Sequence, residues 1–317
     1  MLASHRLWLW STGWAGCGQW DRSNYRKNDK FFFNYVSIIA TGWAATVGPR
    51  KIIVRSKFES PDWHNAVAGI ISSTKAGTTA SGLIAAIESV VDHEGTCLIA
   101  FHNDARPIVL HHTLEPAGRK HYLERYLAGP YLLDPLYQLA IRKKKPTLCR
   151  FRDQLPDRFR SSEYYRQYCE RTHLLDEMDY LTQVSGQTTV VLVIGRRDRM
   201  FTKAELHRLG MIEPVVQSAI RKTWDEWVAK AGNPHGDDNV HKRLTRCFEK
   251  FGESVLTHRE RQISQFLLRG HSSKSIAREL KIAPGTVMVH KRNLFGKLGI
   301  SSQYELFSML IDDLSRA

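Results

Sequence analysis

The sequence predicts an α+β region, built on an antiparallel sheet with flanking helices, followed by an all-α region of four helices. Three observations support this division. Between residues 61 and 228, short apolar runs alternate with apolar residues at helical spacing. The stretch Ala229–Asp238 is polar, contains glycine and proline and has no apolar period, which is typical of a linker. Beyond it, the patterned segments all have helical spacing.

Composition and charge narrow the classes of function. The chain has 317 residues, 42% of them hydrophobic and 25% charged, which suits two packed domains and argues against wholesale disorder. Its longest apolar runs, such as Thr189–Ile194, are far shorter than the roughly 18 residues of a membrane-spanning helix. Because the net charge is +14, we expect a polyanionic partner, either double-stranded DNA or an acidic membrane surface.

The cysteines form no metal-binding or disulfide pattern. There is no Cys-x-x-Cys pair and no histidine at zinc-site spacing, and the number of cysteines is odd. They are Cys17, Cys97, Cys149, Cys169 and Cys247. We therefore expect no metal, no cofactor and a reducing, cytoplasmic compartment, in which buried thiols pack as small apolar groups.

The first sixty residues differ from the rest of the chain. They hold most of the tryptophans, yet they show no sustained helical or strand period. We expect residues 1–60 to be a disordered extension or the product of a start codon assigned too far upstream. An alternative is a signal peptide with a lipid-attachment cysteine, since Arg6 precedes an apolar stretch and Cys17 follows it. Against this, Trp10–Gly13 makes the stretch poorly apolar.

The first elements of the α+β region are a helix and a hairpin. Gly82 and the small and polar residues just before it are predicted to break the apolar pattern. The apolar residues that follow have helical spacing and predict a helix from about Ser81 to Asp92. The runs Thr96–Phe101 and Pro107–His112 are apolar or β-branched, and the tetrapeptide Asn103–Arg106 between them is rich in turn formers. Two strands joined by a turn are therefore predicted.

Two further helices are predicted in the middle of this region. Ala117–Leu127 has helical spacing and ends at Gly129 and Pro130. Asp134 can cap a helix that continues to about Ile141. The basic run Arg142–Lys145 at the end of this helix is interpreted as a solvated face that complements the helix dipole.

The region closes with a second hairpin between two helices. Ser161 or Ser162 opens a tyrosine-rich helix, and Glu177–Val184 and Thr188–Gly195 are predicted strands. Thr202 begins a long amphipathic helix with the capping-box spacing of Thr202 and Glu205. Hairpins that alternate with helices in this way resemble GAF- or PAS-like sensory modules, an architecture that encloses small molecules.

Past the linker, the pattern predicts a connecting helix at Asn239–Lys250 and then a tight helical pair. Thr257 lies three residues before Glu260, which is a second capping box, and Gly270 ends the helix that it opens. Ser272 or Ser273 caps the next helix.

Two more helices complete the pattern. A sharp turn at Lys281–Gly285 leads into a third helix, Thr286–Leu298, whose exposed side is short and basic. The fourth, Tyr304–Leu314, carries an apolar stripe that needs a cover, either the domain's own core or a second copy of the chain. The stripe makes this helix our candidate for a dimer interface.

The string Leu256–Ile311 resembles the LuxR-type helix-turn-helix domain of bacterial transcription regulators. The matching residues are Leu256, Thr257, Arg259, Glu260, Gly270, Ser272, Lys274, Ile276, Ala277, Leu280, Ile282, Thr286, Val287, His290, Lys297, Leu298 and Gly299. The chain departs from the family pattern at Ala283, where a capping serine is usual, and at Met288, where a lysine is usual.

This resemblance implies that the third helix enters the major groove of DNA. Val289 would then touch a thymine methyl group, and Arg292 a guanine edge or a phosphate. The candidate DNA-binding residues are Lys274, Thr286, Met288, Val289, His290, Lys291, Arg292 and Lys297. Packing at the helix junction is the alternative for His290, and a solvated face is the alternative for the lysines and arginine.

An aromatic-plus-aspartate set in the first region resembles the set with which acyl-homoserine-lactone receptors hold their signal. The candidate ligand-binding residues are Tyr122, Tyr126, Tyr131 and Asp134. In place of the glycine-rich stretch expected downstream, the chain has Phe159–Leu175. The alternative interpretation is that Asp134 only caps a helix and that the tyrosines pack in the core.

Together these features predict a sequence-specific, dimeric DNA-binding regulator that a small-molecule effector controls. We expect residues 61–228 to be the sensory domain, 229–250 the linker and connecting helix, and 251–317 the DNA-binding domain. An acyl-homoserine-lactone receptor is the main alternative. A phosphorelay response regulator is less expected, because no receiver residues can be assigned. The same holds for an enzyme, because no catalytic motif can be assigned.

Overall fold

The computed structural model describes residues 57–316 except residue 104 and the segments 117–118, 143–146 and 233–238. The expectation for residues 1–60 therefore lies almost wholly outside the described residues, as does most of the predicted linker. The described residues belong to one compact unit. Among their helices, none combines the length and the apolar content that crossing a bilayer requires.

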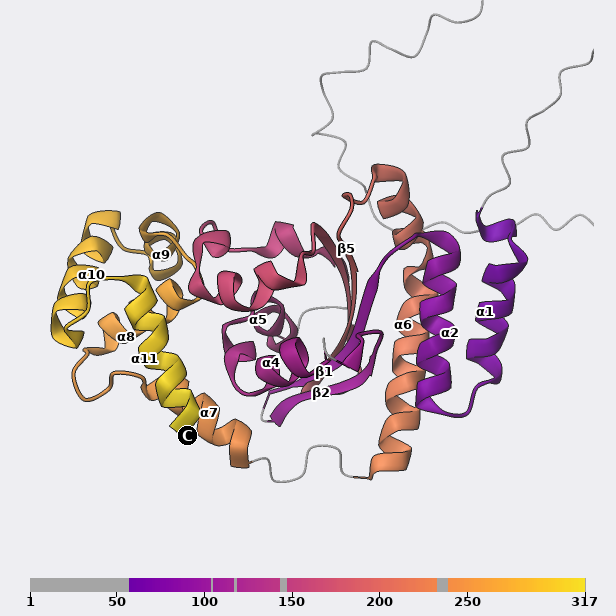
Figure 1. The fold of residues 1–317 in the computed structure, drawn as a ribbon, viewed down its shortest axis with the longest axis horizontal. Coiled ribbons are helices and arrows are strands. Elements are labelled where there is room, and N and C mark those ends of the chain that lie inside the picture. The colour runs from indigo at the N-terminus through magenta and orange to yellow at the C-terminus, as the bar shows by residue number, and fades with distance from the viewer. Residues whose placement is uncertain (1–56, 104, 117–118, 143–146, 233–238, 317) are drawn as a thin grey trace, which may run out of the picture. The chain divides into compact units, whose positions relative to one another are not determined.

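A five-stranded antiparallel sheet forms the centre of the α+β region (Figure 1). Its strands follow the order β2-β1-β5-β4-β3, and every neighbouring pair is antiparallel. The strands are β1 (Gly95–His102), β2 (Ala105–His112), β3 (Thr147–Arg150), β4 (Asp176–Gln183) and β5 (Thr188–Arg196). Both predicted hairpins, β1–β2 and β4–β5, are confirmed.

The edge strand β3 has no counterpart among the predicted elements. It is four residues long, all of them half-buried, and it pairs only with β4. So short a strand carries no readable alternation, and only Pro146 separates it from the basic run at 142–145. Its place in the sheet comes from the neighbouring strand rather than from its own pattern.

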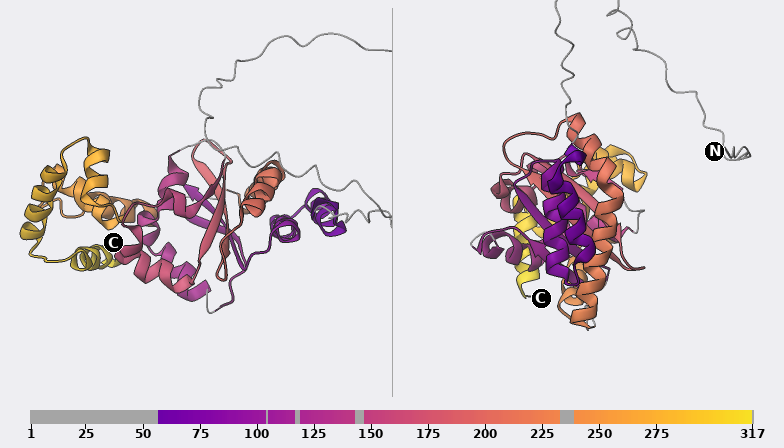
Figure 2. Two further views of the ribbon diagram at one scale, coloured as in Figure 1. Left: turned by 90° about the horizontal axis from the view of Figure 1, so that it is seen from above. Right: turned by 90° about the vertical axis from the view of Figure 1, so that its right-hand side faces the viewer.

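Three long helices lie on one face of the sheet, as Figures 1 and 2 show. They are α1 (Pro61–Ser72), α2 (Ala76–Val90) and α6 (Lys203–Ala231). α2 packs against both α1 and α6. Because side chains alternate along a strand, Leu98 and Ala100 of β1 join this helical core, whereas Ile99 and Phe101 face the opposite side.

The helix expected from about Ser81 begins earlier, at Ala76, and runs through Gly82. A Cβ atom on Gly82 would lie only 3.2 Å from Cγ1 of Ile70 in α1. The glycine is therefore a point of close approach between two helices rather than a break. The sequence signal for a turn is overridden by this packing.

The opposite face of the sheet carries short helical segments. The α-helices there are α4 (Arg125–Leu127) and α5 (Pro135–Ile141). The 3₁₀ turns are Pro130–Leu133, Phe151–Gln154, Phe159–Ser161 and Glu170–Thr172, and the π turns are Arg119–Glu124 and Tyr165–Cys169; one more 3₁₀ turn, Lys57–Glu59, precedes α1. The predicted tyrosine-rich helix is thus a series of 3₁₀ and π turns, in which the Ser162 hydroxyl accepts the Tyr165 amide at 3.2 Å.

Five helices make up the C-terminal part. They are α7 (Asn239–Lys250), α8 (His258–Leu268), α9 (Ser273–Leu280), α10 (Pro284–Leu298) and α11 (Gln303–Arg316). The capping box that opens α8 is present: the Thr257 hydroxyl accepts the Glu260 amide, and the Glu260 carboxylate accepts the Thr257 amide. Gly270 is left-handed, with φ of +87°, as its place after α8 predicts.

The turn before α10 differs in detail from the prediction. Lys281 takes the left-handed conformation, with φ of +53°, and α10 starts at Pro284 rather than at Thr286. Gly285 therefore lies inside the helix. Proline needs no amide partner in a first helical turn, so it extends the helix backwards where no side chain caps it.

The apolar stripe of α11 is covered by the chain itself. Leu306, Phe307 and Leu310 are buried, and Leu314 packs against Gly129 in the turn after α4. The cover comes from the chain itself, partly from the helix-turn-helix core and, at Leu314, from the α+β region. The stripe is therefore not a free face for a second copy.

A buried ion pair fastens α6 to the sheet. The guanidinium of Arg196, at the end of β5, donates to both carboxylate oxygens of Glu205, at 2.8 and 3.0 Å. Both side chains are buried. Arg196 lowers the pKa of the Glu205 carboxyl, so this stabilisation is complete above the ordinary glutamate pKa of about 4.3 and is lost only in stronger acid.

We predict that Glu205→Ala lowers the free energy of unfolding by about 3–5 kcal/mol, because it leaves the Arg196 guanidinium buried without its counter-charge. Urea unfolding of the full chain measures this. Asp225→Ala, which removes an exposed carboxylate from the same helix, is the control and should change the free energy by less than about 0.5 kcal/mol. Equal effects of the two variants would contradict the role given to the pair.

Candidate functional site

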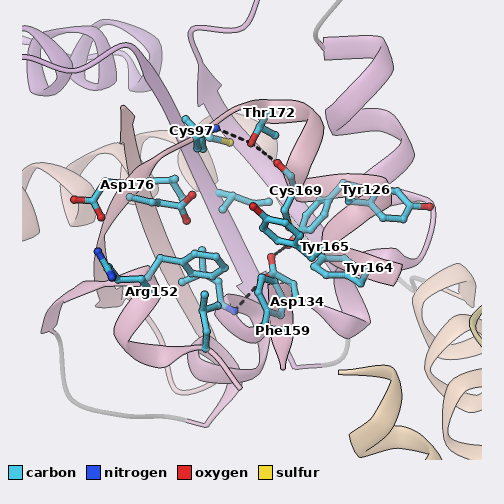
Figure 3. A pocket seen from close by; sticks show the side chains of 18 of the residues that line it. Cys97, Tyr126, Asp134, Arg152, Phe159, Tyr164, Tyr165, Cys169, Thr172 and Asp176 are labelled. Atoms are coloured by element: carbon cyan, nitrogen blue, oxygen red, sulfur yellow. Dashed lines mark hydrogen bonds between the residues drawn. The ribbon is translucent and has the colours of Figure 1, made fainter. Parts of the chain in front are cut away.

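A cavity of about 250 Å³ lies on the face of the sheet opposite α2 and α6. Strands β1, β4 and β5 form one wall, and α5 and the short helical turns form the other. Figure 3 shows Tyr126, Tyr164 and Tyr165 on one side of it and Arg152 and Asp176 on the other. The lining is mainly apolar and aromatic with a few polar groups, which is the usual character of a small-molecule site.

Asp134 is held on the cavity wall by two hydrogen bonds. Its Oδ1 accepts the Leu136 amide at 2.8 Å, which caps α5, and its Oδ2 accepts the Tyr126 hydroxyl at 2.8 Å. Burial raises the pKa of Asp134 to about 6, although both hydrogen bonds act in the opposite direction. Burial and the adjacent Asp134 also raise the pKa of Tyr126, which keeps this phenol protonated as the donor.

The structure brings together only part of the predicted ligand-binding set. Tyr126 and Asp134 both line the cavity. Tyr131 is buried outside the lining, with its hydroxyl 2.6 Å from Nδ1 of His241 in α7. The side chain of Tyr122 is outside the described residues. The helix cap and the ligand-site interpretation of Asp134 are thus compatible, because the same carboxylate caps α5 and faces the cavity.

Sequence reasoning missed most of the lining. Glu177 was expected only as a strand residue, yet it lines the cavity from β4. Cys97 and Cys169 also line it, and burial raises the pKa of Cys97 to about 12 and that of Cys169 well above its usual value, so both thiols stay protonated. The strand alternation could have placed Glu177 on the face opposite α6. The position of the tyrosine-rich turns against that face had no signal in the sequence.

One residue in the wall of the cavity, Phe159, also contacts the helix-turn-helix. We call residues Asp157–Phe159 the strap. Phe159 lines the cavity, and a Cβ atom on Gly270 would lie 2.7 Å from the Phe159 Cα. The Arg158 amide donates to the Gly270 carbonyl at 3.0 Å.

Asp157 gives the strap a polar anchor. Its carboxylate accepts the Ser272 amide at 2.9 Å and also the Ser272 hydroxyl. Ser272 is the N-cap of α9, so the strap binds at the turn between α8 and α9. Partial burial opposes ionisation of Asp157, but the hydrogen bonds from Ser272 prevail and lower its pKa.

The two faces of α10 have different roles. Val287 and Leu294 are fully buried against α8 and α9. On other faces Met288 is 59% exposed and Val289 52% exposed, and Arg292 is exposed as well. An exposed face that mixes apolar and cationic side chains can contact both base edges and phosphates.

The remaining candidates for DNA contact occupy different environments. Thr286 and Lys274 are exposed, and His290 is half-buried. The Lys291 ammonium lies over the ring of Phe295 at 5.3 Å. Partial burial is the main cause that lowers the pKa of Lys291, and the positive charge of Arg158 lowers it further. Lys297 forms an ion pair of 2.8 Å with the buried Glu260, which gives it a structural contact within the domain.

Comparison with known proteins identifies the C-terminal region. Residues 254–310 match the luxR family of bacterial regulatory proteins. A protein of Aeromonas salmonicida, named as an HTH-type transcriptional regulator in the exeN 3′ region, is 31% identical over 160 residues, which are 49% of this chain and 82% of that protein. The monoamine regulon transcriptional regulator of Klebsiella aerogenes is 27% identical over 200 residues, 62% of this chain and 74% of that protein.

Other relatives share less. The transcriptional regulatory protein UhpA of Escherichia coli is 47% identical over 60 residues, 19% of this chain and 31% of that protein. Among solved structures, the VqsR LBD domain from Pseudomonas aeruginosa gives a TM-score of 0.47 at 21% identity, over 53% of this chain and 99% of that chain. Escherichia coli SdiA gives a TM-score of 0.39 at 14% identity, over 78% of this chain and 94% of that chain.

The similarity to the Aeromonas protein extends over most of that protein's length and thus well beyond the helix-turn-helix. This chain therefore belongs to the LuxR family of bacterial helix-turn-helix transcription regulators.

Proposed function

We propose that this regulator binds a specific DNA site and that a small molecule in the cavity controls this binding. The observation that carries the proposal is the double position of Phe159, which lines the cavity and touches the turn between α8 and α9. Residues 61–228 would be the sensory domain, 229–250 the linker and connecting helix, and 251–317 the DNA-binding domain. The protein would act in the cytoplasm, where its DNA is.

On the DNA side, we propose that α10 enters the major groove. The exposure of Met288, Val289 and Arg292 supports contacts with base edges, and that of Thr286 and Lys274 supports contacts with phosphates. His290 and Lys291, each half-buried, would contact the backbone. These half-buried side chains and Lys297, which already holds Glu260, are expected to contribute less to affinity than Arg292.

We propose that two copies bind one site. A single domain of this size reaches too few bases for a selective site, and two copies spaced by about one helical turn double the contacts. Because the stripe of α11 is buried in its own chain, the pairing would use another surface.

The strap offers a physical route for control. A ligand that fills the cavity presses on the side chain of Phe159, and the backbone of the same residue lies against Gly270. The positive charge of Arg158 in the strap also lowers the pKa of Lys291 on α10, after the effect of burial. Ligand and DNA would therefore be coupled through the docking of residues 157–159.

An acyl-homoserine-lactone remains the second candidate for the ligand. The feature that favours it is the Asp134–Tyr126 pair on the cavity wall, since a carboxylate can accept an amide hydrogen beside an aromatic ring.

The proposal is tested with the full chain. Its operator is selected from a random pool of duplexes, and compounds that raise the unfolding temperature are then added during an anisotropy titration. We expect such a compound to change the Kd for the operator by about 5-fold or more. Val193→Phe, which fills the cavity from β5, should abolish the effect. Stabilising compounds that leave the Kd unchanged would refute control through the cavity.

We predict that Arg292→Ala weakens operator binding by about 1–3 kcal/mol and relaxes preference at one base pair, if the guanidinium meets a base. Lys203→Ala removes an exposed positive charge at the start of α6 and serves as the charge-matched control, with little change in affinity. Unaltered affinity and preference in the arginine variant would rule out this role.

We predict that Gly270→Ala releases the strap, because the new methyl group would meet the backbone of Phe159. Gly299→Ala is the matched control: it also places alanine at positive φ, a strain of about 1–2 kcal/mol, but meets nothing within 4 Å. Hydrogen exchange of the Arg158 amide should therefore accelerate in the first variant only. Equal exchange rates in the two variants would mean that the strap is not held at Gly270.

A further inference from the structure

Strand β4 carries a pair of acidic residues beside the cavity: Glu177 lines it, and Asp179 is buried outside the lining. Glu177 and Asp179 are two positions apart on this strand, so they share one face of the sheet. Met178 and Tyr180 point to the other face, where the Tyr180 hydroxyl donates to the Leu209 carbonyl of α6 at 2.8 Å. The two carboxyl groups therefore lie on the cavity side.

The carboxyl group of Asp179 lacks a conventional hydrogen-bond donor among the described residues. Asp179 is fully buried, and neither of its carboxylate oxygens accepts a hydrogen bond from any residue that the structure describes. Its carboxyl instead meets that of Glu177, which lines the cavity. Asp134 differs, because the Leu136 amide and the Tyr126 hydroxyl satisfy it.

Three basic residues near the acidic pair or in the cavity lining are paired or exposed. Arg150 pairs with Asp176, whose Oδ2 also accepts the Phe201 amide at 2.9 Å. Arg152 and Arg160 belong to the lining but are exposed. Within the described part of the chain, no cation faces Glu177 and Asp179 in an ion pair.

Two such groups cannot both ionise without a counter-charge. Burial is the first cause that raises the pKa of Glu177, to about 8, and Asp134 adds to it. Burial and then Glu177 raise the pKa of Asp179 well above its usual value. At neutral pH, without a counter-charge, the pair therefore retains a proton.

The rest of the cavity suits an apolar body. Phe101 and Phe151 contribute rings, and Tyr164, Tyr165 and Tyr168 add further aromatic faces. Aromatic faces attract cations as well as apolar groups. A ligand with one positive charge and an aromatic or aliphatic body would match both the acidic wall and its surroundings.

We propose that the cavity binds a small organic cation, a protonated amine on an aromatic or short aliphatic body, whose ammonium group lies against Glu177 with Asp179 buried behind it. This inference rests on the proposed function, because it names the chemical class of the effector. The ammonium group donates a hydrogen bond to Glu177 and supplies the positive charge that the carboxyl pair lacks among the described residues, and its arrival displaces the retained proton.

Other titratable groups face the same space from several elements. They are Cys97 on β1, Tyr126 in α4, Asp134 at the start of α5, Tyr164, Tyr165, Tyr168 and Cys169 in the tyrosine-rich turns, Asp176 on β4, and Arg152 and Arg160 at the rim. The buried thiols and phenols among them remain protonated because burial raises their pKa values. The proton released near neutral pH would therefore come from the carboxyl groups.

The test uses the full chain and compares small molecules that carry a positive charge with matched neutral and negatively charged molecules. Amines of graded size, from butylamine through 2-phenylethylamine to octylamine, are compared with the matching alcohols and carboxylates and with N-octanoyl-homoserine lactone. We expect an amine to raise the unfolding temperature and to bind in calorimetry with release of about one proton at pH 7, detected from the dependence of the heat on the buffer. The alcohols and carboxylates should do neither.

Three variants test whether amine binding depends on Glu177 and Asp179. Glu177→Gln should weaken amine binding at least 10-fold and abolish proton release, and the fold should persist because the amide can donate to Asp179. Asp179→Asn is the second variant and should act in the same direction. Glu170→Gln, an exposed carboxylate outside the lining, should leave binding unchanged.

The outcomes separate this inference from the proposed function. If a neutral or anionic compound binds and alters operator affinity while no amine binds, the cation is refuted and control by a small molecule stands. Amine binding that Glu177→Gln leaves unchanged also overturns the inference. If no compound of any class alters operator affinity, both proposals fail.

Discussion

The structure depends on the two-sided alternation of the central strands. One set of side chains on β1, β4 and β5 packs against α2 and α6 in a continuous apolar core. The alternate set faces short, irregular turns that close over the sheet without filling the space. A single antiparallel sheet thus supplies a rigid support on one face and a cavity on the other. The buried pair of Arg196 and Glu205 fixes the long helix to that support.

The cavity and the helix-turn-helix share one hydrophobic cluster. Phe159 and Leu136 from the α+β region belong to the same cluster as Ile263 and Leu306 of the C-terminal helices. His241 of α7 extends this continuity, since it stacks on Tyr131 and lies within hydrogen-bonding distance of its hydroxyl. Residues around the cavity therefore pack in the same cluster as residues that support the C-terminal helices.

The sequence allowed local features to be predicted better than contacts between distant segments. Capping boxes at Thr202 and Thr257 and the left-handed Gly270 were all correctly placed, because each depends on residues within a few positions of each other. Gly82 was misinterpreted because its role depends on Ile70 across a helix interface. The cavity could be predicted only through Asp134 and Tyr126, eight residues apart. Its other wall comes from a strand that follows more than forty residues later.

The ion pair between Lys297 and Glu260 ties the last turn of α10 to the first turn of α8. The same carboxylate also accepts the amide that opens α8, so a single buried group sets the angle at which two helices meet. The exposed residues from Thr286 to Arg292 take no part in this joint. Under the proposed contact of α10 with DNA, paralogues would acquire new operators by exchanging only these exposed residues, with the ion pair that orients the two helices left intact.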